Sequence, residues 1–122
     1  LTGLSNDEIQ FRREEIAIKF AIDWGHVVVL KGAFAVIASP DGRSTIIPVA
    51  TPALARAGTG DVLAGLIVGL RAQGLDAYAA AVAGAFIHAQ AGLFAADTLG
   101  TTASVLASDV LEAVADVLAE LE

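Results

Sequence analysis

Apolar residues recur at helical spacing in the first part of the chain. The segment SNDEIQFRREEIAIKFAIDWG begins with Ser5, which is followed three residues later by Glu8, the pattern of a capping box at a helix start. Apolar residues such as Ile16 and Phe20 then follow at helical spacing. This pattern predicts one amphipathic helix that ends near Gly25.

Short apolar runs and turn residues make up the next part. HVVVL, residues 26–30, is a β-branched run typical of a strand that is buried on both faces. FAVIAS and RSTIIPV flank the turn PDG and predict a β-hairpin with Asp41 and Gly42 at its bend.

Everything after Gly58 indicates helices. We expect one over residues 60–73 that stops at Gly74, a second over residues 76–97 and a third from Ser108 to the end, with LGTTAS as the last connection. Helix, strand, hairpin and then helices form an α/β pattern.

The segment AYAAAVAGAFIHAQAGLFAA, residues 77–96, has no charge and is long enough to cross a bilayer. It is mostly Ala and Gly, with His88 and Gln90 near its middle, whereas membrane insertion is driven mainly by Leu, Ile, Phe and Val. We therefore expect a helix buried against a sheet and no membrane association.

Composition narrows the function. The 122 residues suit a single domain, and the net charge of −7, with only seven Lys and Arg, leaves no basic stripe for nucleic acid. Cysteine is absent, which excludes disulfides and thiolate chemistry and favours the cytoplasm. Methionine is absent too, even at position 1, so we expect the chain to be a piece of a longer protein.

The sequence Gly58-Thr59-Gly60-Asp61 precedes the first long apolar run. Glycines at a helix start let an anion approach free N–H groups, and the helix dipole favours negative charge there. Asp61 then has two interpretations: it compensates the dipole as a capping residue, or it is a base beside a bound phosphate.

Lys31 and Gly32 follow the predicted strand of residues 26–30 directly. The junctions between strands and loops at one edge of an α/β sheet form the usual ligand crevice. Lys31 is therefore a candidate ligand-binding residue, and the alternative is a solvated charge at a strand end.

Taken together, LKG, AGTGDVLAGLIVGLRAQG, AAAVAGAFIHAQAG and ASDVLEAV resemble the C-terminal half of the ribokinase-like superfamily, and most closely the ADP-dependent NAD(P)H-hydrate dehydratases. The resemblance spans residues 12–116. It implies an α/β, three-layer fold in which buried strands and a hairpin are followed by three helices. Residues 1–122 would form a partial, nucleotide-binding domain without the N-terminal half and its HPGE segment, and such a fragment is expected to be inactive alone.

The resemblance also implies an activity: a lyase that restores NADH or NADPH from the hydrated 6-hydroxy form, with ADP or ATP as co-substrate and Mg²⁺ as cofactor. Asp61 would remove the hydroxyl proton and touch the hydrated nicotinamide, and the N–H groups of Gly58, Thr59 and Gly60 would form an anion cradle. The residues implied to bind the nucleotide are Lys31, Gly32, Ala33, Phe34, Ala35 and Gly60. Ala35 stands where the family often has Thr, so contact there would use the backbone. No metal site on the protein is implied, and the complete protein is expected to be a homo-oligomer.

Two other functions stay open. One is a small-molecule kinase of the same superfamily, acting on a hydroxymethylpyrimidine or a thiazole alcohol, and the other is a non-catalytic half that only binds nucleotide. His88 is expected to be a packed, hydrogen-bonded residue. Asp109 is expected to be a first-turn residue that favours the helix dipole.

Overall fold

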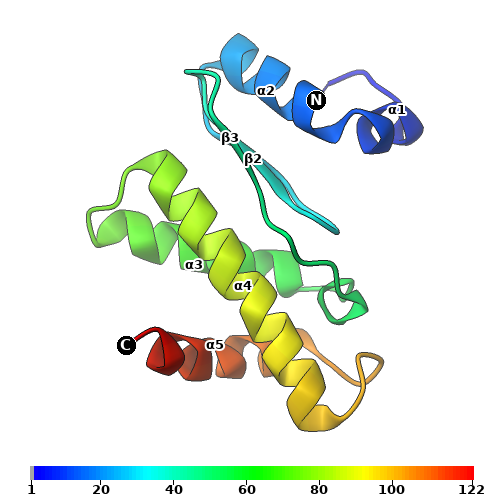
Figure 1. Cartoon of the computed structure of the whole chain (residues 1–122), viewed down its shortest axis with the longest axis vertical. Helices are drawn as coiled ribbons and strands as arrows, with labels where there is room; N and C mark the ends of the chain where they lie inside the picture. Colours follow the sequence, from blue (N-terminus) through cyan, green and yellow to red (C-terminus); the bar gives the residue numbers. More distant parts are fainter. Residues whose placement is uncertain (1) are drawn as a thin grey trace.

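The computed structural model describes residues 2–122, with the side chains of all of them except residues 10 and 11. Figure 1 shows a helical layer on one side of a small sheet and a group of helices on the other side. The elements in chain order are α1 (Asn6–Phe11), α2 (Arg13–Trp24), β1 (Val28–Leu30), β2 (Val36–Ala38), β3 (Ser44–Ile46), the 3₁₀ helix η1 (Pro52–Leu54), α3 (Thr59–Ala72), α4 (Ala77–Leu99) and α5 (Ala107–Leu121). The predicted fold class is confirmed: strands and a hairpin are followed by three helices.

The sheet has the order β1-β2-β3 and is antiparallel throughout. Its central strand, β2, is buried along its whole length. Because successive side chains of a strand point to opposite faces, Val36 and Ala38 pack on Ala17 and Ala21 of α2, whereas Ile37 joins a cluster with α3 and α4. Because the side chains of β2 alternate between its two faces, the sheet packs on α2 at one face and on α3 and α4 at the other, which gives three layers.

Helix α4 runs through the centre of the molecule in Figure 1 and is apolar on all sides. By length and composition it could cross a membrane, but 56% of its most apolar stretch is buried inside the fold. Two of its glycines permit close packing. A Cβ at Gly84 would lie 2.8 Å from Ile67 of α3, and one at Gly92 would lie 2.7 Å from Leu54 of η1. The small residues of α4 thus serve contacts with neighbouring elements.

The first predicted helix is in fact two. Ser5 forms the expected capping box with Glu8, but α1 ends at Phe11, and the next residue, Arg12, has a φ of −125° and a ψ of 42° that are not helical. Arg13 then begins α2 and donates to the carbonyl of Leu30, 2.9 Å away. The prediction of one continuous helix was wrong, because the backbone at Arg12 is not helical, and a pattern of apolar spacing does not reveal such a break.

Strand β1 is half-buried along its length. The prediction of a strand buried on both faces was wrong for the described residues, since β1 lies at the edge of the sheet and pairs there with β2. Helix α2 packs against β1, and the apolar residues Val28 and Leu30 join the α2 cluster.

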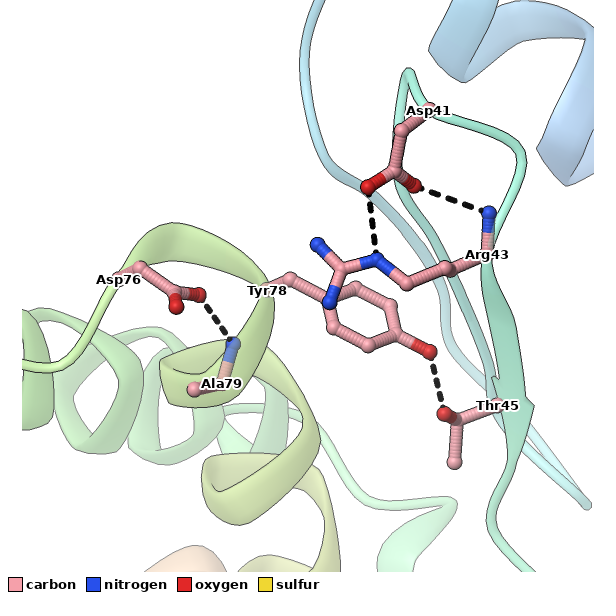
Figure 2. A network of polar contacts seen from close by, with 6 residues as sticks. All are labelled: Asp41, Arg43, Thr45, Asp76, Tyr78 and Ala79. Atoms are coloured by element: carbon pink, nitrogen blue, oxygen red, sulfur yellow. Dashed lines mark hydrogen bonds and ion pairs between the residues drawn. The ribbon is translucent and has the colours of Figure 1, made fainter.

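Polar contacts fasten the hairpin to α4, as Figure 2 shows. The hydroxyl groups of Tyr78 and Thr45 are hydrogen bonded to each other. The guanidinium of Arg43 lies 4.5 Å from the centre of the Tyr78 ring and donates to Asp41 at the hairpin bend. Nearby, Asp76 caps α4 by accepting from the N–H of Ala79 at 2.8 Å. The contacts of Tyr78 fix the position of the first turn of α4 relative to the hairpin.

Candidate functional site

A cavity of about 540 Å³ lies where the sheet meets the start of α3. Its wall combines the turn after β1, the segment after β3, the loop before α3, the first turn of α3 and the middle of α4. The predicted site residues in this wall are Lys31, Gly32, Ala33, Ala35, Gly58, Thr59, Gly60 and Asp61. The fold therefore brings two distant sequence motifs together.

Phe34 is the predicted site residue outside this wall. It lies in the same turn as Lys31, half-exposed, with a positive φ of 53° that is uncommon for a residue with a side chain. Its N–H donates to the carbonyl of Val49 at 3.0 Å. This bond anchors the turn to the segment after β3, so Phe34 shapes the wall through its backbone.

Lys31 places its ammonium group against the start of α3. A Cβ at Gly60 would be only 2.6 Å from Lys31 Nζ, so the glycine leaves the space that the ammonium fills. Within the described part of the chain, Lys31 forms no ion pair. A cation beside the positive end of a helix is unfavourable by itself, and a bound anion would compensate for both charges.

Gly58 is the N-cap of α3 and has a φ of 89°, which a glycine adopts without strain. Across residues 2–122, the N–H groups of Gly58 and Gly60 donate to no protein acceptor, whereas Thr59 N–H donates to Arg56 and Asp61 N–H to Gly58. Two free N–H donors thus lie on either side of Thr59 at the helix start.

Thr59 is buried, and its side chain is engaged with the protein. Its hydroxyl lies 2.8 Å from the carbonyl oxygens of both Leu54 and Arg56. The contribution of this side chain is therefore to hold the turn between η1 and α3. Arg56, from the same loop, lines the cavity and donates to the carbonyl of Ala103 in the connection before α5.

Asp61 is exposed in the first turn of α3 and lines the cavity. Helix α3 has no side-chain cap, and the Asp61 carboxylate forms no hydrogen bond or ion pair with the residues that the structure describes. The capping interpretation thus gains no hydrogen bond, although the charge still favours the helix dipole. The carboxylate remains available to a ligand.

His88 joins the site from the middle of α4. It is buried, and its Nε2 lies 2.9 Å from the carbonyl oxygen of Thr59, so the expectation of a packed, hydrogen-bonded histidine is confirmed. Burial lowers the pKa of His88, the hydrogen bond to Thr59 opposes this, and the charge of Lys31 lowers the pKa further. The neutral ring is therefore favoured.

The sequence reasoning missed Arg13 and Arg56. Arg13 reaches from α2 to the carbonyl of Leu30, which is 17 residues away, and fixes the chain just before Lys31. Neither arginine belongs to a local motif. Their positive charge was the available indication, because the chain has only seven Lys and Arg and each of them is therefore a candidate for binding an anion. The cavity wall contains Lys31 and Arg56 against the single carboxylate of Asp61, so it is cationic in a chain of charge −7.

Solved structures with the same arrangement of elements exist. The fold is similar to the crystal structure of ADP/ATP-dependent NAD(P)H-hydrate dehydratase from Bacillus subtilis, co-crystallized with ATP/Mg²⁺. The TM-score is 0.93 at 31% sequence identity over 99% of this chain. The matched part is 43% of the Bacillus chain.

The sequence comparisons agree with the structural one. A family model described as NAD(P)H-hydrate dehydratase matches residues 1–115, and the chain belongs to this family. It is 47% identical over 122 residues to the bifunctional NAD(P)H-hydrate repair enzyme Nnr of Moorella thermoacetica, and 40% identical over 101 residues to the ADP-dependent (S)-NAD(P)H-hydrate dehydratase of Xanthomonas campestris. The matches cover 100% and 83% of this chain, but only 23% and 35% of those relatives. The predicted family is confirmed.

Proposed function

We propose that this chain supplies the nucleotide-binding half of an enzyme that dehydrates hydrated NADH or NADPH with ADP or ATP as co-substrate. The observation that carries the proposal is the contact of the Lys31 ammonium with Gly60, one residue before Asp61. A lysine ammonium group, two free N–H groups and an unbonded carboxylate thus lie near one helical turn at the wall of a cavity, which supports an anion site there.

The phosphate site would use four features of the chain. The N–H groups of Gly58 and Gly60 are free donors, the start of α3 contributes its dipole, and Lys31 contributes a full positive charge. Together they would stabilise the charge that spreads over a phosphoryl group during transfer. The turn from Lys31 to Ala35 would lie along the nucleotide. Support comes from the Bacillus relative, which was co-crystallized with ATP/Mg²⁺.

Asp61 would act as the base. It would accept the proton of the 6-hydroxyl group while the hydroxyl oxygen attacks the terminal phosphorus of ADP or ATP, so that AMP or ADP leaves. The C6–O bond of the phosphate ester then breaks, pushed by the lone pair of the ring nitrogen, and inorganic phosphate departs. Loss of a proton from C5 restores the double bond of NADH or NADPH.

Mg²⁺ would enter this site with the nucleotide. Among the described residues there is no group of three or more metal-ligating side chains, and Asp61 is the single carboxylate in the cavity wall. In such sites Mg²⁺ usually keeps several waters and is held by substrate phosphate oxygens together with one or two carboxylates. When bound, the ion neutralises phosphate charge.

Product analysis tests this proposal. The full-length protein is mixed with hydrated NADH and ADP, and we expect AMP, free phosphate and the near-ultraviolet absorption of reduced nicotinamide. A stable phosphate ester would instead show a kinase. Nucleotide binding without any product would show a non-catalytic half. Either result contradicts the dehydratase proposal.

We also propose that the complete protein is a cytoplasmic homo-oligomer. The absence of cysteine suits a reducing compartment, and α5 exposes the apolar side chains of Leu111, Leu118 and Leu121. Light scattering of the full-length protein would give its mass, and a monomer would contradict the assembly. Fractionation of cells that express it would test the compartment.

A further inference from the structure

We propose that His88 is a positioning residue for the phosphate site: it holds the carbonyl group of Thr59 and thereby fixes the first turn of α3, with the N–H groups of Gly58 and Gly60 free for phosphate oxygens. The inference rests on the proposed function, because it assigns a role within the same site. His88 does not need to touch the substrate in this role.

The geometry determines which atom carries the proton. His88 Nε2 lies 2.9 Å from the carbonyl oxygen of Thr59, and a carbonyl oxygen only accepts hydrogen bonds. Nε2 must therefore be the protonated nitrogen, and in the neutral ring Nδ1 is bare. The contact is long-range, since 29 residues separate the two partners, so it ties the middle of α4 to the start of α3.

The start of α3 has a particular need for such a tie. Gly58 and Gly60 flank Thr59, and glycine loses more conformational freedom on ordering than any other residue. The helix has no side-chain cap to hold its first turn. Thr59 is instead held on two sides, by its hydroxyl at the carbonyls of Leu54 and Arg56 and by its own carbonyl at His88.

Charge explains why a neutral ring donor suits this place. The ionic groups around His88 in the cavity wall are Lys31 after β1, Arg56 before α3 and Asp61 on α3. A permanent cation at position 88 would repel Lys31 and compete with it for the incoming anion. A neutral imidazole supplies the hydrogen bond and leaves the phosphate to Lys31 and the helix dipole.

Three variants test the role. His88→Leu removes the donor, His88→Gln keeps an N–H donor at similar reach without a titrating ring, and Gln90→Leu is a control on the same helix outside the cavity wall. ADP affinity is measured by calorimetry on the full-length protein, with the thermal unfolding midpoint of each variant. We expect His88→Leu to weaken ADP binding about tenfold or more, roughly 1.4 kcal/mol. His88→Gln should stay within about threefold, because its amide keeps the hydrogen bond to Thr59, a bond worth about 1 kcal/mol, and Gln90→Leu should bind as the unchanged protein does.

Several results would overturn the positioning role. One is a folded His88→Leu protein that binds ADP at full affinity, and another is an equal loss in the Leu and Gln variants, which would show that ring packing matters and the donor does not. Should His88→Leu fail to fold, His88→Asn replaces it, because its shorter amide cannot reach Thr59.

Absence of ADP binding in the unchanged protein would overturn both proposals. Absence of turnover with this pattern of ADP affinities would overturn only the dehydratase.

Discussion

The ammonium group of Lys31 occupies the space that a side chain at Gly60 would need, since a Cβ built there lies 2.6 Å from Lys31 Nζ. Gly60 has a helical, negative φ, so its backbone does not require glycine. What position 60 requires is the absence of a side chain. Lys31 of the LKG motif and Gly60 of the GTGD motif thus act together, because the missing side chain at position 60 makes room for the ammonium group.

Gly60→Ala is expected to separate ligand binding from stability. The new methyl group must displace the end of the flexible Lys31 side chain, which moves the ammonium away from the free N–H groups and weakens ADP binding about three- to tenfold, or about 1 kcal/mol. Alanine also has a higher helix propensity than glycine by up to about 1 kcal/mol, so the unfolding midpoint should stay or rise. Calorimetry and thermal unfolding measure the two effects.

Gly65→Ala is the matched control for this variant. It lies in the same helix, and a Cβ there meets nothing within 4 Å. It should raise stability and leave ADP affinity unchanged. Equal ADP affinities of the Gly60 and Gly65 variants would show that the position of Lys31 does not matter for the nucleotide.

Lys31→Ala should weaken ADP binding more than it disturbs folding, because Lys31 is exposed and forms no ion pair with the described residues. The affinity of the unchanged protein should also fall as salt rises, since counter-ions screen the exposed charge. The variant should show a flatter salt dependence. A parallel loss of the unfolding midpoint and of affinity would make Lys31 a structural residue.

Much of the architecture was predictable from local patterns. Helices α3 and α4 have a glycine or a capping residue at their ends, as at Gly58, Asp76 and Gly100, and these mark boundaries within a few residues. The hairpin follows from the Asp41-Gly42 bend. The break at Arg12 was not predictable because no glycine or proline marks it, and the half-buried state of β1 was not predictable because it depends on which strands pair.

The site was predictable in its motifs and not in its contacts. The sequence indicated Lys31 and the Gly58 to Asp61 segment, and the fold places them in one cavity wall. The hydrogen bonds that hold them, from Arg13 to Leu30 and from His88 to Thr59, span 17 and 29 residues. Such contacts have no local periodicity, so they required the structure.

Gly84→Ala is expected to destabilise the packing of α4 on α3. The added methyl group would lie 2.8 Å from Ile67 Cγ1 and 3.4 Å from the Ile67 backbone nitrogen, and the backbone cannot move as easily as a side-chain end. Overpacking of this kind costs about 1 to 3 kcal/mol. Denaturant unfolding measures it. Gly69→Ala, with nothing within 4 Å, is the control, and equal midpoints would contradict the close approach.

The free energy of unfolding should depend on the ionisation of His88. Burial first, and then the charge of Lys31, lowers the pKa of His88 from its usual 6.5, so the unfolded chain binds a proton at a higher pH than the folded one. The stabilisation is complete above about pH 6.5 and is lost as the pH falls through the lowered pKa. Denaturant unfolding from about pH 7.5 to about pH 5, which spans the usual pKa of histidine, measures this loss of stability.

The matched variant for this pH dependence is His88→Gln, which should lose less stability than the unchanged protein over the same range. The comparison removes the contribution of the carboxylates, which both proteins share. Lys31, Arg56 and Asp61 line the same cavity wall in both proteins, so their contribution is shared as well. Parallel curves of stability against pH would contradict the burial of a neutral ring.

Asp61 is the residue on which the chemical proposal depends. Asp61→Asn keeps the shape of the side chain and removes its ability to accept a proton. Asp116→Asn, on the exposed side of α5, is the control for loss of one negative charge. Both variants should fold, because the Asp61 carboxylate holds no hydrogen bond with the residues that the structure describes.

The most direct test is the rate of NADH formation from hydrated NADH and ADP by the full-length Asp61→Asn protein, measured together with its ADP affinity. The predicted result is a loss of kcat by a factor on the order of 10² to 10⁴, the range for a general base, with ADP binding kept. Asp116→Asn should retain full activity. A kcat close to that of the unchanged protein would contradict the account and leave Asp61 as a residue that only favours the helix dipole.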